Sequence, residues 1–118
     1  MNELHEAKVF FGYPPDEFKF DNGKPRLDLV PAELIEAVGT VRTYGVQKYK
    51  DEFSYRKVEP KRYRAAFMRH VCAWLKNPHG VDAESGLPHI WHVACNVAFL
   101  IELDKEKNND FNGTADLH

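Results

Sequence analysis

Three polar side chains, His89, His92 and Asn96, interrupt the otherwise apolar stretch PHIWHVACNVAFLIEL. On a helix, their spacing of three and four residues places them on one stripe. Imidazole and amide groups can hydrogen-bond a ligand, and imidazole can also bind a metal or carry a proton. Burying several polar groups is costly unless each finds a partner, and a ligand or metal is one such partner. The stripe therefore predicts a pocket, with polar core residues that bridge helices as the alternative.

Further polar residues are expected at the same pocket. His70 falls in the apolar stripe of the preceding helix, so its side chain should also point inward. Asp82 and Glu84 lie in the loop just before His89 and can reach the same end of that helix. The pocket is thus expected to combine imidazole, carboxylate and amide groups.

A second pattern that could carry chemistry is the ExxE pair formed by Glu33 and Glu36. A divalent ion with phosphate ligands needs carboxylates at such a spacing. The same spacing is also common on solvated helix faces, where it carries no function. Both interpretations of the pair stay open at this stage.

Basic residues flank the helix that carries the ExxE pair. Lys24 and Arg26 enclose a proline in GKPRLDL just before this helix, and Lys48 lies near its other end in YGVQKY. Cations beside a helix N-terminus are suited to binding an anion such as phosphate. The basic run YRKVEPKRYR at 55–64 is either a solvated helix start or a means of steering phosphate into the pocket.

The elements that position these residues are three helices, and the predicted fold class is all-α. The first begins near Pro31 and runs through AELIEAVGTVRTYGVQKY, and the second extends from Pro60 to Asn77. Pro88 opens the third, which is expected to end near Asp104. Its apolar residues cover almost the whole circumference, as in a helix buried on every side. The other two helices are too few to cover the third on every side, so a homo-oligomer, a dimer or higher, is expected.

The 118 residues are expected to form a single domain, 1–118. Within it, we predict an irregular N-terminal arm at 1–19, a helical core at 20–104 and a mobile polar tail at 105–118.

Composition narrows the class of protein. With 43% hydrophobic and 29% charged residues and a formal net charge of −2, the chain is not expected to bind nucleic acid or a membrane surface in general. It also has no apolar run of membrane-spanning length and no signal peptide pattern, so a cytoplasmic location is expected. Cys72 and Cys95 lie in apolar helical stretches and are predicted to be buried free thiols.

Four segments together resemble a known family: GKPRLDLVPAELIEAV, YGVQKY, RHVCAWL and ESGLPHIWHVACNVAFLIEL. They are similar to the phage-borne dATP/dGTP diphosphohydrolase N-terminal family, which is related to the MazG-like all-α nucleotide pyrophosphohydrolases. The resemblance covers roughly residues 20–104. It implies a MazG-like helical bundle assembled as an oligomer, with a purine (deoxy)nucleotide in a pocket between helices. The implied reaction releases pyrophosphate from a deoxynucleoside triphosphate (dNTP) with Mg²⁺ or Mn²⁺, in the cytoplasm of a phage-infected bacterium.

The resemblance also suggests roles for the site residues. Metal would be held by Glu33, Glu36 and Glu84, with His89 or His92 as a further ligand or as the base. The phosphates would be neutralised by the cations Lys24, Arg26 and Lys48. If the pocket instead binds a nucleotide without hydrolysing it, the base and phosphates would be hydrogen-bonded by His70, His89, His92 and Asn96, and the base would stack on Trp91 or Tyr44.

One departure from the MazG-like pattern bears on the reaction. Those enzymes follow their ExxE pair with an ExxD pair on the next helix, where this chain has His89-x-x-His92 and then Asn96. Two imidazoles suit Mn²⁺ or another transition metal better than Mg²⁺, or no metal at all. The alternative function is therefore a non-hydrolytic phage protein that sequesters a nucleotide, such as a host signalling nucleotide.

Overall fold

The computed structural model of this chain describes residues 23–115, with side chains placed as far as residue 105. The chain divides into one unit that ends at Pro31 and a second that begins at Ala32. The predicted arm at 1–19 lies outside the described residues. The described part of the first unit contains the short 3-10 helix η1 (Leu27–Leu29). Arg26, which directly precedes this helix, forms an ion pair of 2.7 Å with Asp28 within it.

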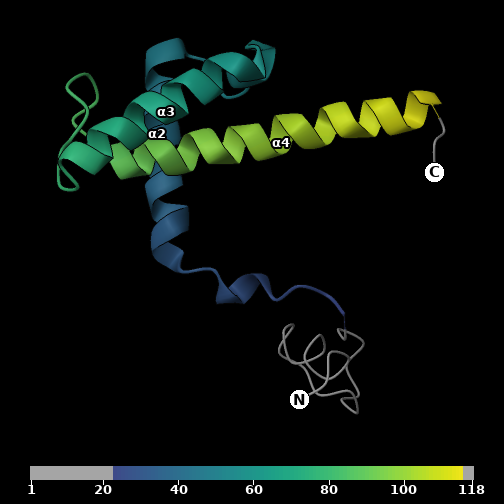
Figure 1. The fold of residues 1–118 in the computed structure, drawn as a ribbon, viewed down its shortest axis with the longest axis horizontal. Helices are drawn as coiled ribbons and strands as arrows, with labels where there is room; N and C mark the ends of the chain where they lie inside the picture. Colours follow the sequence, from purple (N-terminus) through teal and green to yellow (C-terminus); the bar gives the residue numbers. More distant parts are fainter. Residues whose placement is uncertain (1–22, 116–118) are drawn as a thin grey trace. The chain divides into compact units, whose positions relative to one another are not determined.

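The second unit is helical, as predicted (Figure 1). It consists of α2 (Ala32–Tyr49), the 3-10 helix η2 (Ser54–Lys57), α3 (Pro60–Lys76) and α4 (His89–Ala115). Residues 23–115 form no strand, and their one β-bridge joins Val81 to Pro88. The all-α prediction is confirmed.

Prolines set several of the helix boundaries. Pro60 occupies the first turn of α3, where its missing N–H has no helical partner to lose. Asn77 precedes Pro78 and adopts an extended conformation, which ends α3. The predicted end of the third helix near Asp104 is wrong, because α4 continues to Ala115. Its extension begins with Lys-Glu-Lys, which are good helix formers, and contains no proline.

The helices of the second unit pack around a small core. Helices α3 and α4 lie along each other, and α2 crosses them (Figure 1). Ala37 and Val41 of α2 and Cys95 and Leu103 of α4 are buried. The predicted apolar stripe of α3 is half-buried against this core; its members are Tyr63, Phe67, His70, Val71 and Trp74.

The prediction that both cysteines are buried is wrong for Cys72, which is exposed, and confirmed for Cys95. Cys72 is the residue directly after Val71, so its side chain points to a different side of the helix from the stripe that packs on the core. It shares its face of α3 with Met68 and Leu75, both of which are also exposed.

One face of α4 is left exposed in the single chain. Ile90, Val97 and Ile101 lie on it, and Ile101 is 65% exposed. Burial of α4 on every side is therefore not achieved by this chain alone, and the second copy expected to cover this face stays a prediction. In the described part of the chain, no helix is both long and apolar enough to span a membrane.

Candidate functional site

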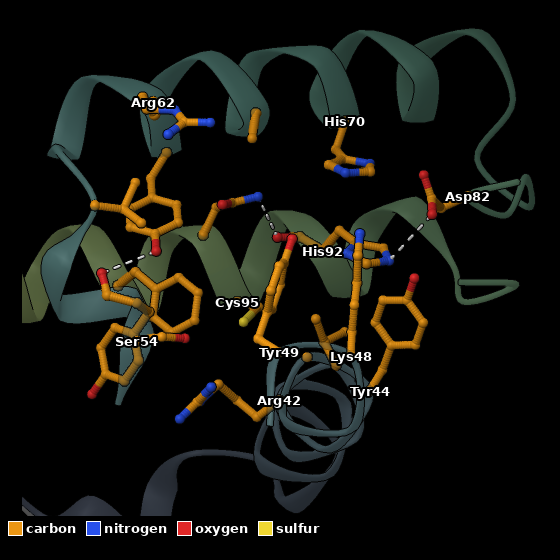
Figure 2. A pocket seen from close by; sticks show the side chains of 18 of the residues that line it. Arg42, Tyr44, Lys48, Tyr49, Ser54, Arg62, His70, Asp82, His92 and Cys95 are labelled. Atoms are coloured by element: carbon orange, nitrogen blue, oxygen red, sulfur yellow. Dashed lines mark hydrogen bonds and ion pairs between the residues drawn. The ribbon is translucent and has the colours of Figure 1, made fainter. Parts of the chain in front are cut away.

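A cavity of about 550 Å³ lies between the three helices of the second unit. Each helix contributes residues at helical spacing: 41, 44, 45 and 48 from α2, 62, 66, 69 and 70 from α3, and 92, 95, 96 and 99 from α4. In Figure 2, Arg62 and Ser54 lie toward one end of the cavity and His70, His92 and Asp82 toward the other. The volume is within the range of pockets that bind small organic ligands.

Aromatic rings form one wall. Tyr55 stacks on Phe99 with ring centroids 4.4 Å apart, and Tyr63 packs on the same ring at 4.9 Å. The Tyr63 hydroxyl donates to the carbonyl of Tyr55 at 3.0 Å, which ties η2 to α3. The Arg42 guanidinium lies 4.6 Å from the centre of the Tyr55 ring, a cation–π arrangement. This wall offers a flat apolar surface bordered by positive charge.

Four basic side chains line the cavity: Arg42, Lys48, Arg62 and Arg69. Lys48 binds Glu84 at 2.5 Å, and this hydrogen bond raises the pKa of Lys48. Among the described side chains, neither Arg62 nor Arg69 forms an ion pair. The cavity therefore presents two guanidinium groups that an anionic ligand could bind.

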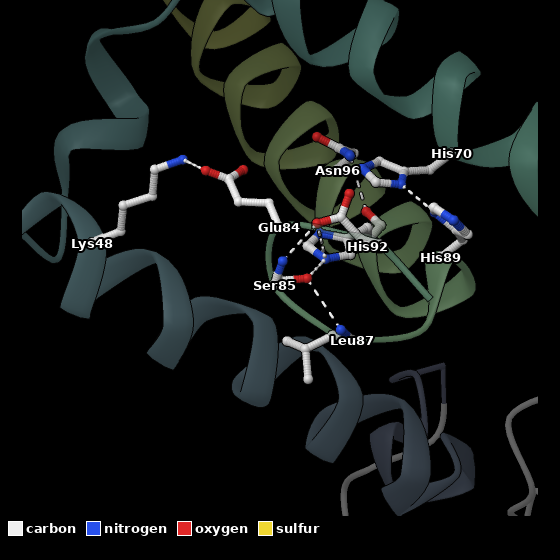
Figure 3. Close-up of polar contacts among 9 residues, drawn as sticks. Lys48, His70, Glu84, Ser85, Leu87, His89, His92 and Asn96 are labelled. Carbon is white, nitrogen blue, oxygen red and sulfur yellow. Dashed lines mark hydrogen bonds and ion pairs between the residues drawn. The ribbon is translucent and has the colours of Figure 1, made fainter. Parts of the chain in front are cut away.

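Three imidazoles gather at the other end of the cavity (Figure 3). Nδ1 of His70 lies 2.9 Å from Nδ1 of His89, so one of the two nitrogens carries the shared proton. The His70 and His92 rings stack at 4.5 Å and are nearly parallel, at 9°. Burial lowers the pKa of both His70 and His92. A lowered pKa favours the neutral form of both rings, in which one ring nitrogen can accept a hydrogen bond or bind a metal.

The loop between α3 and α4 holds this end in place. Its turn is closed by Gly86, whose positive φ of 73° is accessible to glycine and whose N–H donates to the carbonyl of Asp82 at 2.7 Å. The Asp82 carboxylate accepts from the N–H of Ser85 at 2.9 Å. The Ser85 hydroxyl lies 2.7 Å from Nε2 of His92 and accepts from the N–H of Leu87 at 3.2 Å. Burial acts to raise the pKa of Asp82, but the hydrogen bonds from Ser85 and the nearby His92 and His70 together lower it.

Asn96 is a buried polar residue with an incomplete set of partners. It is 8% exposed and lines the cavity, and its amide nitrogen donates to the carbonyl of His92 at 3.0 Å. In the part of the chain that the structure describes, no hydrogen bond reaches its Oδ1. Because buried polar atoms are nearly always paired, this oxygen is available to a polar ligand atom.

The structure brings about half of the predicted site residues together. Those that line the cavity are Lys48, His70, Glu84, His92 and Asn96, and also Tyr44 and Asp82. His89 does not line the cavity itself but is hydrogen-bonded to His70, which does. Trp91, Glu33 and Glu36 do not line it, and both glutamates are exposed on α2. Lys24 and Arg26 belong to the first unit. The roles given to all of these residues stay predictions.

Several cavity residues were not predicted as site residues, namely Arg42, Arg69, Tyr55, Tyr63 and Phe99; of these, Tyr63 and Phe99 were expected only as members of inward helix stripes. Arg62 was predicted only as part of the basic run at 55–64, for which one interpretation was that it steers phosphate into the pocket. A signal was present, because Arg62 and Arg69 are seven residues apart and border the predicted apolar stripe of α3. Tyr55 gave no such signal, since the loop before α3 has no periodicity.

Fold and cavity together define a small all-α unit whose cavity is lined by both aromatic and basic side chains. The chain belongs to the dATP/dGTP diphosphohydrolase N-terminal family, whose model matches residues 14–112. A relative from Salmonella phage PMBT28, named dATP/dGTP diphosphohydrolase, is 34% identical over 85 residues. The match covers 72% of this chain but only 29% of that relative. No solved structure matches this chain.

Proposed function

We propose that this chain acts as a purine (deoxy)nucleoside triphosphate diphosphohydrolase that releases pyrophosphate and acts on the phage or host dNTP pool. Membership of the family and the name of the phage relative support this activity. The single observation that carries the proposal within the structure is the composition of the cavity. The cavity has an aromatic wall and is also lined by Arg62 and Arg69, whose guanidinium groups have no carboxylate partner among the described side chains.

A nucleotide matches both features. Its base can stack on aromatic rings, and its phosphates can accept charge-assisted hydrogen bonds from guanidinium groups. Asn96 adds a buried amide whose oxygen can accept a hydrogen bond from a base or sugar. Of the aromatic residues predicted to stack on the base, Tyr44 lines the cavity and Trp91 does not.

The proposed reaction is attack of water on the α-phosphorus of the triphosphate. A new oxygen–phosphorus bond forms, the bond from this phosphorus to the oxygen bridging to the β-phosphate breaks, and pyrophosphate leaves. His92 is proposed to take the proton of the water, because it lines the cavity and burial lowers its pKa, which favours the neutral form. Arg62, Arg69 and Lys48 would offset the charge that develops on the phosphates.

Mg²⁺ or Mn²⁺ is proposed as the cofactor, but the predicted carboxylate ligands do not converge. Glu33 and Glu36 are exposed outside the cavity, and Glu84 is paired with Lys48. Mg²⁺ prefers oxygen ligands in an octahedral arrangement, and these three carboxylates do not supply one in the described chain. We therefore assign no step of the reaction to a metal held by them.

Assembly and location complete the proposal. The exposed apolar residues of α4, among them Val97 and Ile101, are what a second copy would cover, in a MazG-like homo-oligomer. The substrate pool places the activity in the cytoplasm of a phage-infected bacterium.

Product analysis tests the proposed reaction. The protein is incubated with each dNTP in turn, with Mg²⁺ or with Mn²⁺, and the products are separated by anion-exchange chromatography. Deoxynucleoside monophosphate and pyrophosphate are expected from dATP and dGTP. Release of single phosphates or of triphosphate from these substrates would refute the proposed bond cleavage.

Matched variants test the cavity. Arg62→Met and Arg69→Met should each raise KM by on the order of tenfold or more, the scale of one lost charge-assisted hydrogen bond. Lys61→Met is the control, because Lys61 lies one residue before Arg62 but is exposed outside the cavity. Equal KM values in all three variants would contradict this use of the cavity.

The second candidate function is sequestration of a nucleotide without hydrolysis. It is favoured by one observation, namely that Glu33 and Glu36 do not join the carboxylates at the cavity. Under this alternative, the same assay returns the nucleotide intact, while equilibrium dialysis detects tight binding that depends on Arg62 and Arg69.

A further inference from the structure

A cluster of possible metal ligands lies at the imidazole end of the cavity. Its members are His70 from α3, Asp82 from the following loop and His89 from the first turn of α4. One ligand atom from each residue lies within 4.8 Å of the other two. All three residues are partly buried, so water competes less for their ligand atoms than it does at the surface.

The distance between the two imidazole nitrogens is close to that found at a metal ion. The two Nδ1 atoms are 2.9 Å apart, joined by a hydrogen bond. Two imidazole nitrogens bound to one tetrahedral metal at about 2.1 Å lie about 3.4 Å apart. If this distance increases by about half an ångström and the shared proton moves to Nε2 of its own ring, both Nδ1 atoms can bind one metal ion.

Neighbouring residues hold the ligands in position. The loop carrying Asp82 is closed by backbone hydrogen bonds from Asp82 to Leu87 at 2.8 Å and from His89 to Gly80 at 3.2 Å. The Asp82 carboxylate is oriented by the N–H of Ser85, and the His70 ring is fixed by stacking on His92. Such support around first ligands is typical of metal sites.

We propose that His70, Asp82 and His89 bind a divalent transition metal ion of the class of Mn²⁺, Co²⁺, Ni²⁺ and Zn²⁺. Two imidazoles and one carboxylate are a ligand set for such ions, whereas Mg²⁺ prefers oxygen alone. Three protein ligands leave a coordination position open for water or for another ligand. The proposal stands on this geometry and does not depend on the nucleotide activity. It differs from the carboxylate set Glu33, Glu36 and Glu84 predicted from the family resemblance.

The position of the cluster gives the site a connection to the cavity. His70 and Asp82 both line the cavity, so a metal held by them borders the space proposed for the nucleotide. Of the two metals implied by the family resemblance, this ligand set favours Mn²⁺ over Mg²⁺.

A titration without nucleotide tests the site. Protein stripped of metal with a chelator is titrated with Co²⁺, whose visible absorption reports nitrogen and oxygen ligands directly. We expect one bound Co²⁺ per chain, displaced by Zn²⁺ and retained in excess Mg²⁺. Displacement by Mg²⁺ as readily as by Zn²⁺, or no absorption change at all, would overturn the proposal.

Variants identify the ligands. His70→Gln and His89→Gln should each weaken Co²⁺ binding by more than about 100-fold, beyond the effect of losing a supporting residue. His79→Gln is the control, because His79 is exposed in the neighbouring loop and lies outside the cluster. Asp82→Asn keeps the acceptor for the N–H of Ser85, so it tests the third ligand even if a histidine variant fails to fold. Circular dichroism reports folding in each case, and wild-type Co²⁺ affinity in the folded variants would refute the site.

The two proposals fail separately. Metal binding that depends on these three residues, in a protein that leaves every dNTP intact, would refute the diphosphohydrolase and keep the metal site. Diphosphohydrolase activity in a wild-type protein that binds no Co²⁺ would refute the metal site and keep the enzyme.

Discussion

Replacing Asn96 with leucine separates a ligand-binding role from a structural one. The Asn96 amide makes one hydrogen bond, to the carbonyl of His92 four residues earlier on the same helix. That carbonyl is also the normal acceptor of the backbone N–H of residue 96, so the change leaves no orphaned group. The lost bond costs about 0.5–1.5 kcal/mol, and the buried leucine side chain offsets much of it. The free energy of unfolding should therefore change by less than about 1 kcal/mol.

Nucleotide binding should respond much more strongly. If Oδ1 of Asn96 accepts a hydrogen bond from the ligand, its loss should weaken binding by on the order of tenfold, which corresponds to about 1.4 kcal/mol. Thermal melts with and without dATP or dGTP measure stability, and calorimetric titration measures affinity. Gln47→Leu is the control, an exposed amide on α2 outside the 550 Å³ cavity. A stability loss above about 2 kcal/mol together with unchanged affinity would refute this role, because it describes a structural residue.

Three further outcomes are expected. Cys72 should react rapidly with a thiol reagent in the native protein, while Cys95 reacts slowly, because burial raises the pKa of Cys95 from 9.0 to about 11. At pH 8 the raised pKa alone lowers the thiolate population of Cys95 by about 100-fold, so the labelling rate of Cys95 should rise with pH up to about 11. Equal labelling rates for Cys72 and Cys95 would contradict this prediction. Ser85→Ala removes the partner of both Leu87 N–H and His92 Nε2 and should lower the free energy of unfolding by about 1–3 kcal/mol in denaturant melts. Light scattering should give a mass above that of the 13.6 kDa chain, and Ile101→Lys should reduce it; a wild-type mass of one chain would rule out the oligomer.

The sequence alone determined the helices and most of their inward faces. Proline at the start of a helix and just after its end has local steric effects, so the boundaries around Pro60 and Pro78 could be predicted. Helical periodicity placed His70, His92 and Asn96 on inward stripes, because residues three and four apart share a face whatever the helix packs against. The end of α4 was not predicted, since a polar segment without a strong stop signal is compatible with both helix and coil.

Only the tertiary structure decided which inward residues meet. Local patterns fix the face of a residue but not which residues of other elements lie opposite, because that depends on helix crossing angles and loop paths. The loop closed by Gly86 places Asp82 beside His70 and His89, and the crossing of α2 brings Arg42 over Tyr55. The same packing leaves Glu33 and Glu36 outside the cavity. The sequence placed His70 and Asp82 at the same pocket as His89, but only the packing of α3, the following loop and α4 brings one ligand atom of each residue within 4.8 Å of the others.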